Sequence, residues 1–173
     1  MWRISRETWW SWGKTLVLAV VIALLVRTLA RSGSGPKTGI NALDFDLPEA
    51  GSGERLSLAQ LRGTPVLIEA MTSWCGVCQR SAGALRDAAN ATRTKPVRFV
   101  SVVLDSNPRA AEQLKQAWGI EHDLLVDDGS FARSYNISML PTFVLIDAAG
   151  KVRAVESGLA DRDDIEGWIS SLD

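Results

Sequence analysis

The stretch VRFVSVVLD at residues 97–105 most limits the folds that are open to this chain. Its apolar residues, largely β-branched, occupy both faces of an extended chain, which is typical of a strand buried on both sides. A second run, PVLIEAM at residues 65–71, has the same character and is interrupted only by the acidic Glu69. Strands of this kind occur in sheets that carry helices on each side, so we expect an α/β protein.

Segments of helical character separate these runs. Residues 75–91 are rich in Ala, free of Pro and carry small or apolar residues at helical spacing. Residues 107–118 open with Asn-Pro, which suits a helix start. Farther along, residues 142–158 have the pattern of two strands joined by the turn AAGK, and residues 161–172 that of an amphipathic helix. This order predicts a central mixed β-sheet flanked by helices.

An apolar leader precedes this pattern. Leu16 to Val26 is an unbroken apolar run of 11 residues, and four of the seven tryptophans fall within the first 12 positions, where an interfacial aromatic belt would place them. The wider segment 9–29 is long enough to cross a hydrocarbon core of roughly 30 Å. We expect residues 1–30 to form a transmembrane anchor. A signal segment cleaved after Ala30 is the alternative.

Composition and charge divide the rest of the chain. Residues 31–39, RSGSGPKTG, have the composition of a flexible linker, and residues 40–173 are expected to form the folded domain. Up to Lys37 the chain has six basic residues and one acidic residue, whereas the remainder has 13 basic and 19 acidic residues. An acidic domain argues against nucleic-acid binding, and the basic leader suits an anionic membrane surface. The positive-inside rule favours a domain outside the cytoplasm.

The two cysteines of the chain, Cys75 and Cys78, lie in WCGVC, where the first buried strand meets its helix. Catalytic groups in α/β sheets gather at the carboxyl ends of strands, and a helix N-terminus favours a thiolate. We expect an exposed Cys75 to be the nucleophile and Cys78 to resolve the mixed disulfide. Trp74 is expected to cover the sulfurs from the side.

Other roles for the cysteine pair remain open. A structural disulfide across this spacing closes too small a loop to stabilise a fold much. A metal site needs about four ligands, and His122 is the only histidine of the chain. Two inert buried thiols are the third alternative. We expect neither a metal nor a cofactor beyond the redox-active pair.

Glu69 lies six residues before Cys75, within the apolar strand. We expect its carboxyl group to be buried beneath the helix start, where a raised pKa would let it accept the proton of Cys78. Strand alternation that turns Glu69 outward at a sheet edge is the alternative.

These motifs resemble a known family. WCGVC after a hydrophobic strand, followed by MLPTFVLID and GKVRAVESG, resembles the thioredoxin fold. The stretch DFDLPEAGSGERLSLAQLRGTPVLI resembles the membrane-tethered TlpA/ResA/ScsD-like thiol–disulfide oxidoreductases of the AhpC/TSA–redoxin superfamily. The resemblance covers about residues 43–170. It implies protein disulfide substrates, a membrane electron donor such as a DsbD-like reductase, and a domain on the periplasmic side of a bacterial inner membrane.

The resemblance also implies a substrate site. Pro141 would follow a cis peptide bond and pack against the disulfide, and the backbone of Leu140 would pair with an extended substrate. Glu69 would match the buried aspartate of thioredoxin. The implied substrate-binding residues are Trp74, Gly76, Val77, Leu140 and Pro141.

Two differences from the motifs of related families bear on the type of reaction that the cysteine pair carries out. Gly76-Val77 lacks the His that strong oxidases often carry between their cysteines, which favours a reductant. Thr72 stands three residues before Cys75, as in redoxin-type thiol peroxidases, but their motif would place a Pro where this chain has Ile68. A peroxidase is therefore one alternative function. A copper carrier, which would use a wider cysteine spacing and a later His, is another.

Overall fold

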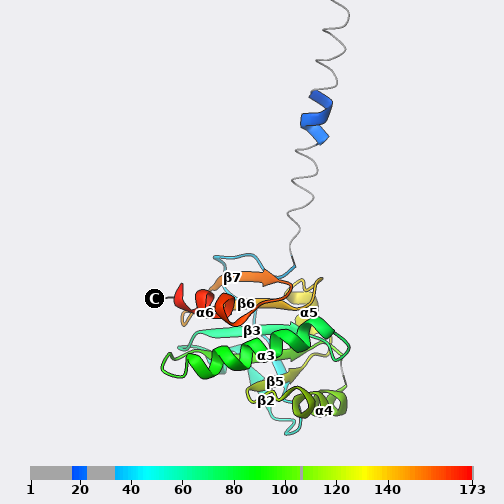
Figure 1. Ribbon diagram of the computed structural model, residues 1–173, viewed down its shortest axis with the longest axis vertical. Coiled ribbons are helices and arrows are strands. Elements are labelled where there is room, and N and C mark those ends of the chain that lie inside the picture. Colours follow the sequence, from blue (N-terminus) through cyan, green and yellow to red (C-terminus); the bar gives the residue numbers. More distant parts are fainter. Residues whose placement is uncertain (1–16, 23–33, 106, 173) are drawn as a thin grey trace, which may run out of the picture. The chain divides into compact units, whose positions relative to one another are not determined.

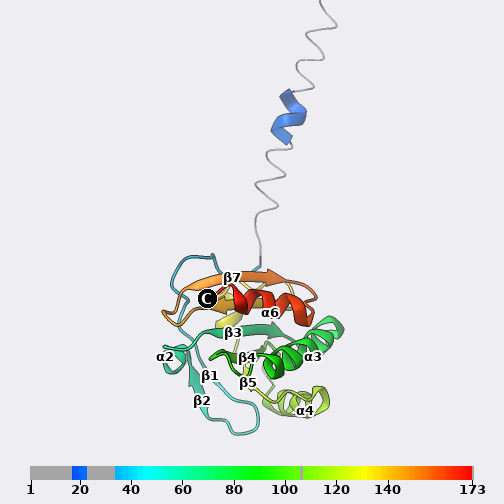
Figure 2. The ribbon, with the colours of Figure 1, turned by 60° about the vertical axis from the view of Figure 1, so that its left-hand side comes forward.

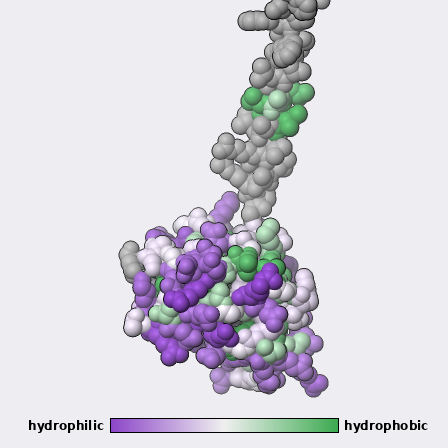
Figure 3. Space-filling model, viewed as in Figure 1, coloured by the Kyte–Doolittle hydropathy of each residue, from purple (hydrophilic) through white to green (hydrophobic). Residues whose placement is uncertain are grey.

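The computed structural model describes residues 17–22, 34–105 and 107–172 (Figure 1). The chain divides into two units, Met1–Gly33 and Ser34–Asp173. In the first unit, residues 17–22 are helical and their apolar side chains are largely exposed (Figure 3). Among the residues that are described, no helix is long and apolar enough to cross a membrane. Most of the predicted span, residues 9–29, lies outside the described residues.

A five-stranded mixed sheet forms the centre of the second unit, in the order β5-β4-β3-β6-β7 (Figure 1). Strand β4 lies between β3 and β5 and is parallel to both, whereas β6 is antiparallel to both β3 and β7. The predicted mixed α/β sheet is therefore confirmed. The strands are β3 (Val66–Met71), β4 (Arg98–Val103), β5 (Asp123–Val126), β6 (Thr142–Ile146) and β7 (Val152–Ser157).

Both faces of this sheet are covered (Figure 2). On one face lie α3 (Gly76–Ala91), α4 (Pro108–Trp118) and α6 (Arg162–Ser170), whose buried side chains pack with those of alternate strand residues. The opposite face carries a second apolar cluster beneath shorter elements. Those elements are β1 (Asp46–Pro48), β2 (Arg55–Ser57), α2 (Leu58–Leu61) and α5 (Ser130–Ser134).

Local signals explain where the longer helices begin and end. The Asn107 side chain caps α4 by accepting hydrogen bonds from the N–H groups of Arg109 and Ala110, and Pro108 occupies the first turn. Gly119 ends the helix with a φ of 63°, a left-handed conformation that favours glycine. The helix boundaries predicted from these residues are confirmed.

The second unit makes contacts that begin before the predicted start of the domain at residue 40. The N–H of Gly35 donates to the carbonyl of Asn136 at 3.0 Å, and the N–H of Gly39 donates to that of Val152 at 2.7 Å. Residues 34–39, predicted as part of the linker, thus lie against the domain. Residues 31–33 of that segment lie outside the described residues.

Candidate active site

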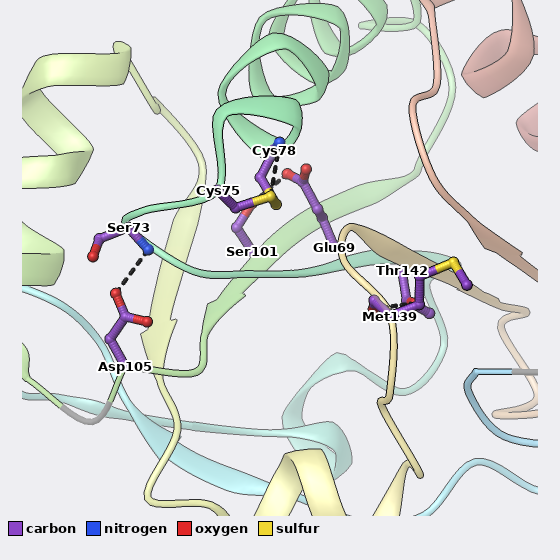
Figure 4. The surroundings of a disulfide bond; sticks show 8 residues. All are labelled: Glu69, Ser73, Cys75, Cys78, Ser101, Asp105, Met139 and Thr142. Carbon is purple, nitrogen blue, oxygen red and sulfur yellow. Dashed lines mark hydrogen bonds between the residues drawn. A yellow bond between two sulfur atoms is a disulfide. The ribbon is translucent and has the colours of Figure 1, made fainter.

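The two cysteines meet at the start of α3, immediately after β3 and its short turn (Figure 4). Cys75 is the N-cap of the helix, and its Sγ accepts a hydrogen bond from the N–H of Cys78 at 3.1 Å. The side chains form a disulfide bond. Cys75 Sγ therefore faces the free N–H groups and the positive end of the helix dipole, which stabilise a thiolate once the disulfide is reduced.

The exposure of the pair partly differs from expectation. Cys75 is 8% exposed and Cys78 is fully buried, so the predicted order is right but Cys75 is less open than expected. Trp74 is 77% exposed. Its indole is therefore largely open to solvent and available to contact a partner. Gly76 is exposed and Val77 is half-buried against the apolar cluster that includes both cysteines.

Glu69 lies in β3, the central strand, and is fully buried. It shares its face of the strand with Leu67 and Met71, which pack on the side of α3, and its carboxyl group points toward the disulfide (Figure 4). The expected burial is confirmed, and the outward alternative is wrong because β4 and β6 flank this strand. Burial raises the pKa of Glu69 to about 8, against a smaller lowering by a hydrogen bond from Ser101.

Ser101 and His122 extend this site in a way that the sequence analysis missed. Ser101 Oγ donates to Glu69 Oε2 at 3.3 Å and lies 2.8 Å from His122 Nε2. The other carboxyl oxygen, Glu69 Oε1, has no hydrogen-bond partner among the described residues. A signal was present, since Ser101 is a polar residue in the middle of the apolar run 97–105. The sequence suggests only a metal-ligand role for His122, because nothing local links it to Ser101.

The predicted cis peptide bond between Leu140 and Pro141 is confirmed. Pro141 is buried at the start of β6, and Leu140 packs against the apolar cluster that contains both cysteines. Met139, which precedes them, is 55% exposed, and its carbonyl accepts a hydrogen bond from Thr142 Oγ1 at 2.8 Å. This cis-proline loop, residues 138–142, therefore lies beside the disulfide.

Ser34 holds the cis-proline loop from outside. Its Oγ accepts hydrogen bonds from the N–H groups of Ser138 at 2.9 Å and Met139 at 3.1 Å. Thr142 Oγ1 lies 3.1 Å from the same oxygen. Ser34 belongs to the segment predicted from its composition to be a linker. These contacts could not be predicted, because the partners of Ser34 are more than 100 residues away along the chain.

A surface pocket adjoins the other side of the site. Asp105 fixes its wall by accepting a hydrogen bond from the N–H of Ser73 at 2.7 Å (Figure 4). The pocket lies next to the exposed Trp74 and has a mixed polar and apolar lining. Its lining residues are Thr72, Ser73, Trp74, Leu104, Asp105, Asn107 and Ala110.

Metal ligands do not gather in the part of the chain that the structure describes, where no three His, Cys, Asp or Glu side chains are placed to hold an ion together. The chemistry that the site offers is that of its two sulfurs and the buried carboxyl group.

Comparisons with known proteins agree with this geometry. The Redoxin family profile matches residues 37–168. The thiol–disulfide oxidoreductase ResA of Geobacillus kaustophilus is 25% identical over 164 residues, which cover 92% of this chain and 94% of that protein. ResA of Bacillus subtilis is also 25% identical over 164 residues, covering 92% of this chain and 91% of that protein.

Solved structures show the same fold. A protein from Chlorobium tepidum, assigned as the thiol:disulfide interchange protein DsbE, superposes with a TM-score of 0.72 and 28% identity over 79% of this chain and 97% of that one. A secreted disulfide oxidoreductase of Mycobacterium tuberculosis gives a TM-score of 0.66 and 25% identity over 74% of this chain and 96% of the other. The second unit thus has the thioredoxin-like fold.

Proposed function

Because this chain belongs to the Redoxin family and is a thiol–disulfide oxidoreductase, we propose that it reduces disulfide bonds of other proteins while tethered to a membrane. One observation carries the proposal. The Cys75–Cys78 disulfide lies at the start of α3, above the buried Glu69 and beside the loop that holds cis Pro141.

The reaction begins from the reduced pair. The Cys75 thiolate attacks one sulfur of the substrate disulfide, the substrate S–S bond breaks, and the departing substrate thiolate takes a proton from water. Cys78 then loses its proton and attacks Cys75 Sγ, which releases the second substrate thiolate. Two electrons pass from the enzyme pair to the substrate, and the product is the Cys75–Cys78 disulfide of the structure.

Glu69 is the proton acceptor for Cys78 in this scheme. Cys78 is fully buried, so hydroxide cannot easily reach its thiol, whereas the Glu69 carboxyl group points toward it (Figure 4). A pKa of about 8 means that the carboxyl group exchanges a proton readily near neutral pH. Glu69 therefore acts in the resolving step and not in the first attack.

Substrate contacts follow from exposure and position. Trp74 and Met139 are exposed apolar side chains on either side of the site, and Gly76 leaves the approach to Cys75 open. An extended substrate segment would pair with the backbone of Leu140, beside the buried Pro141. Val77 packs beneath the approach and shapes its floor.

The proposal also covers the direction of electron transfer, the protein that supplies the electrons and the cellular location of the domain. The absence of His between the cysteines supports a reductant, and such an enzyme needs a membrane donor of the DsbD-like class to restore its thiols. The apolar run 16–26 and the tryptophans around it support an anchor in a bacterial inner membrane. The basic N-terminus supports a domain on the periplasmic side.

Insulin reduction by the full-length protein, with dithiothreitol as electron source, tests the proposal. We expect Cys75→Ser to abolish activity and Cys78→Ser to accumulate mixed disulfides with insulin. Equal accumulation with both variants would contradict the assigned roles. Peroxide consumption under the same conditions should not exceed that of Cys75→Ser, and rapid consumption would point to the peroxidase alternative. A reduction potential near thioredoxin's, about −270 mV, would support a reductant.

A further inference from the structure

Glu69 needs a route by which it can release to solvent the proton that it accepts. It is fully buried in the central strand of the sheet, yet a carboxyl group that takes a proton from Cys78 must release that proton before the next cycle. The disulfide and α3 cover it on one side. A route to solvent must therefore lead through polar groups that contact the carboxyl group.

One chain of polar groups starts at Glu69. Ser101 is the residue paired with Glu69 in the parallel register of β3 and β4, and its Oγ donates to Glu69 Oε2 at 3.3 Å. The same Oγ lies 2.8 Å from His122 Nε2. Ser101 in turn pairs with Leu124 of β5, and His122 comes two residues earlier, so all three polar groups lie on the sheet face that carries α3.

The chain of contacts ends at the surface. Strand β5 is the edge strand of the sheet, and His122 lines a shallow surface pocket just before it. The polar line therefore runs sideways across two strands, from beneath the disulfide to the sheet edge. The pocket is lined by Thr64, Pro96, Val97, Arg98, Phe99, His122 and Asp123.

We propose that Ser101 and His122 form the path by which Glu69 exchanges its proton with solvent, through the β5 edge of the sheet. The inference rests on the proposed thiol–disulfide exchange and on Glu69 as the acceptor for Cys78. It assigns Ser101 and His122 as positioning residues that act through Glu69. The proton thus leaves at the sheet edge, away from the bound substrate.

The steps balance. Cys78 gives its proton to the Glu69 carboxylate, and a half-turn of the carboxyl group brings the protonated oxygen to Ser101. Glu69 then donates to Ser101 Oγ while the Ser101 hydroxyl proton passes to His122 Nε2. The cationic imidazole releases its Nδ1 proton to water in the pocket. One proton enters at Cys78 and one leaves at Nδ1, and His122 is left as the Nε2–H tautomer. It regains the Nδ1–H tautomer by exchange with water in the pocket, taking one proton at Nδ1 and giving one up at Nε2.

The surroundings of His122 make its cation a short-lived, unfavourable state of the path. Burial lowers the pKa of His122 to about 4, with Lys115 of α4 lowering it further and Asp123 of β5 opposing the shift. Asp123 is itself bound to Arg98 of β4 at 2.8 Å, and Lys115 to Glu49 at 2.9 Å. His122 is therefore neutral near pH 7, and its Nε2 accepts from the Ser101 hydroxyl only while protonated Glu69 donates to Ser101 Oγ. The cation forms only briefly.

Ellman's reagent separates the two thiol steps in one trace of the full-length protein. Attack by reduced Cys75 releases the first thionitrobenzoate, and resolution by Cys78 releases the second. The test variants are Ser101→Ala and His122→Gln, the latter keeping a nitrogen that can bond Ser101 while losing the second ring nitrogen. Ser81→Ala is the matched control, because Ser81 is a fully buried serine whose Oγ has no hydrogen-bond partner among the described residues.

We expect the first phase to be unchanged in both test variants. The second phase should slow roughly a hundredfold at neutral pH, the lower end of what a positioned proton acceptor contributes. With a pKa of about 8, Glu69 is mostly protonated at that pH and must first lose its proton along the path before it accepts the proton of Cys78. Loss of a merely structural hydrogen bond would move the midpoint of the rate–pH curve, whereas loss of the path lowers the plateau. Free imidazole should restore the rate of His122→Ala by entering the pocket, with no effect on wild type.

Two results would overturn the path: a second phase in Ser101→Ala and His122→Gln as fast as in Ser81→Ala, or a shifted midpoint with an unchanged plateau in both. Absence of the first phase in wild type would instead refute the proposed thiol exchange itself.

Discussion

A carboxyl group buried in the central strand of a sheet destabilises a fold unless its hydrogen bonds are satisfied. Glu69 has one such bond, from Ser101, and its Oε1 has none among the described residues. Its strand neighbours on the same face, Leu67 and Met71, are apolar and fully buried. The position therefore costs stability and suits a group that must hold a proton next to Cys78.

The loss of folding stability caused by burying Glu69 should depend on pH. In the unfolded chain the pKa of this carboxyl group is 4.5, and burial raises the pKa in the folded chain to about 8. Between these values the unfolded chain has lost a proton that the folded chain keeps, so a rise in pH favours unfolding. The free energy of unfolding is thus highest below about pH 4.5, and it falls by up to about 5 kcal/mol as the pH rises toward 8.

Urea unfolding of the oxidised protein measures this effect. The free energy of unfolding of wild type, minus that of Glu69→Gln, should fall across this pH window because the amide does not titrate. A difference that stays constant with pH would show that Glu69 is already ionised in the folded state.

Residues along one segment were predictable, and contacts between distant segments were not. The spacing in WCGVC predicted a reactive cysteine pair from local sequence, and the resemblance to the thioredoxin fold implied the cis bond at Pro141. Ser101 escaped notice because its role appears only when the register of β3 and β4 sets it opposite Glu69. The high exposure of Trp74 could not be predicted, because the exposure of a side chain depends on what packs around it.

At the scale of elements, the start of α3 sets the redox properties of the pair. The helix N-terminus favours the Cys75 thiolate, and a thiolate stabilised further makes the disulfide a stronger oxidant. Val77 lies between the cysteines, and its hydrocarbon side chain contributes no charge there. The element alone thus supports a moderate potential.

A cation at this helix start should raise the potential. Val77→His is expected to make the pair more oxidising by about 30 mV or more, since about 1.4 kcal/mol of extra stabilisation of the reduced form corresponds to that shift. Equilibration with glutathione measures it, and Val77→Thr, similar in shape and neutral, is the control. A shift of the same size in Val77→Thr would mean that packing, and not charge, sets the potential.

The segment of residues 34–39 acts as a brace for the cis-proline loop. Removing the Ser34 hydroxyl in Ser34→Ala takes away the acceptor of the Ser138 and Met139 N–H groups, which should loosen the loop by about 0.5–1.5 kcal/mol. Hydrogen exchange at these two amides should accelerate. Ser134→Ala, which removes an exposed hydroxyl of α5, should leave their exchange unchanged, and equal acceleration in both variants would refute the brace.

At the scale of the whole molecule, the layered fold could be predicted because burial of both faces of the sheet requires apolar residues at consecutive positions of its strands. Runs such as 65–71 and 97–105 are apolar on both faces only where helices or loops cover each side. The boundary at residue 40 came from composition, and Gly and Ser are equally common in linkers and in close backbone contacts. Gly35 belongs to the second kind, because a Cβ there would lie 2.4 Å from Val155.

The apolar leader should decide where the molecule works. Val20 and Val21 lie in the middle of the run 16–26, and a charge at the centre of a spanning segment costs about 2.5–3.5 kcal/mol for each residue. We expect wild type in bacterial membranes to resist extraction by alkaline carbonate, and Val20→Arg with Val21→Arg to be released. Val20→Leu with Val21→Leu is the control. Added protease should digest the wild-type domain in intact spheroplasts if it faces outward, and protection there would place it in the cytoplasm. Release of wild type by carbonate would refute the anchor, because a protein held by a spanning segment does not dissociate when surface charges are neutralised.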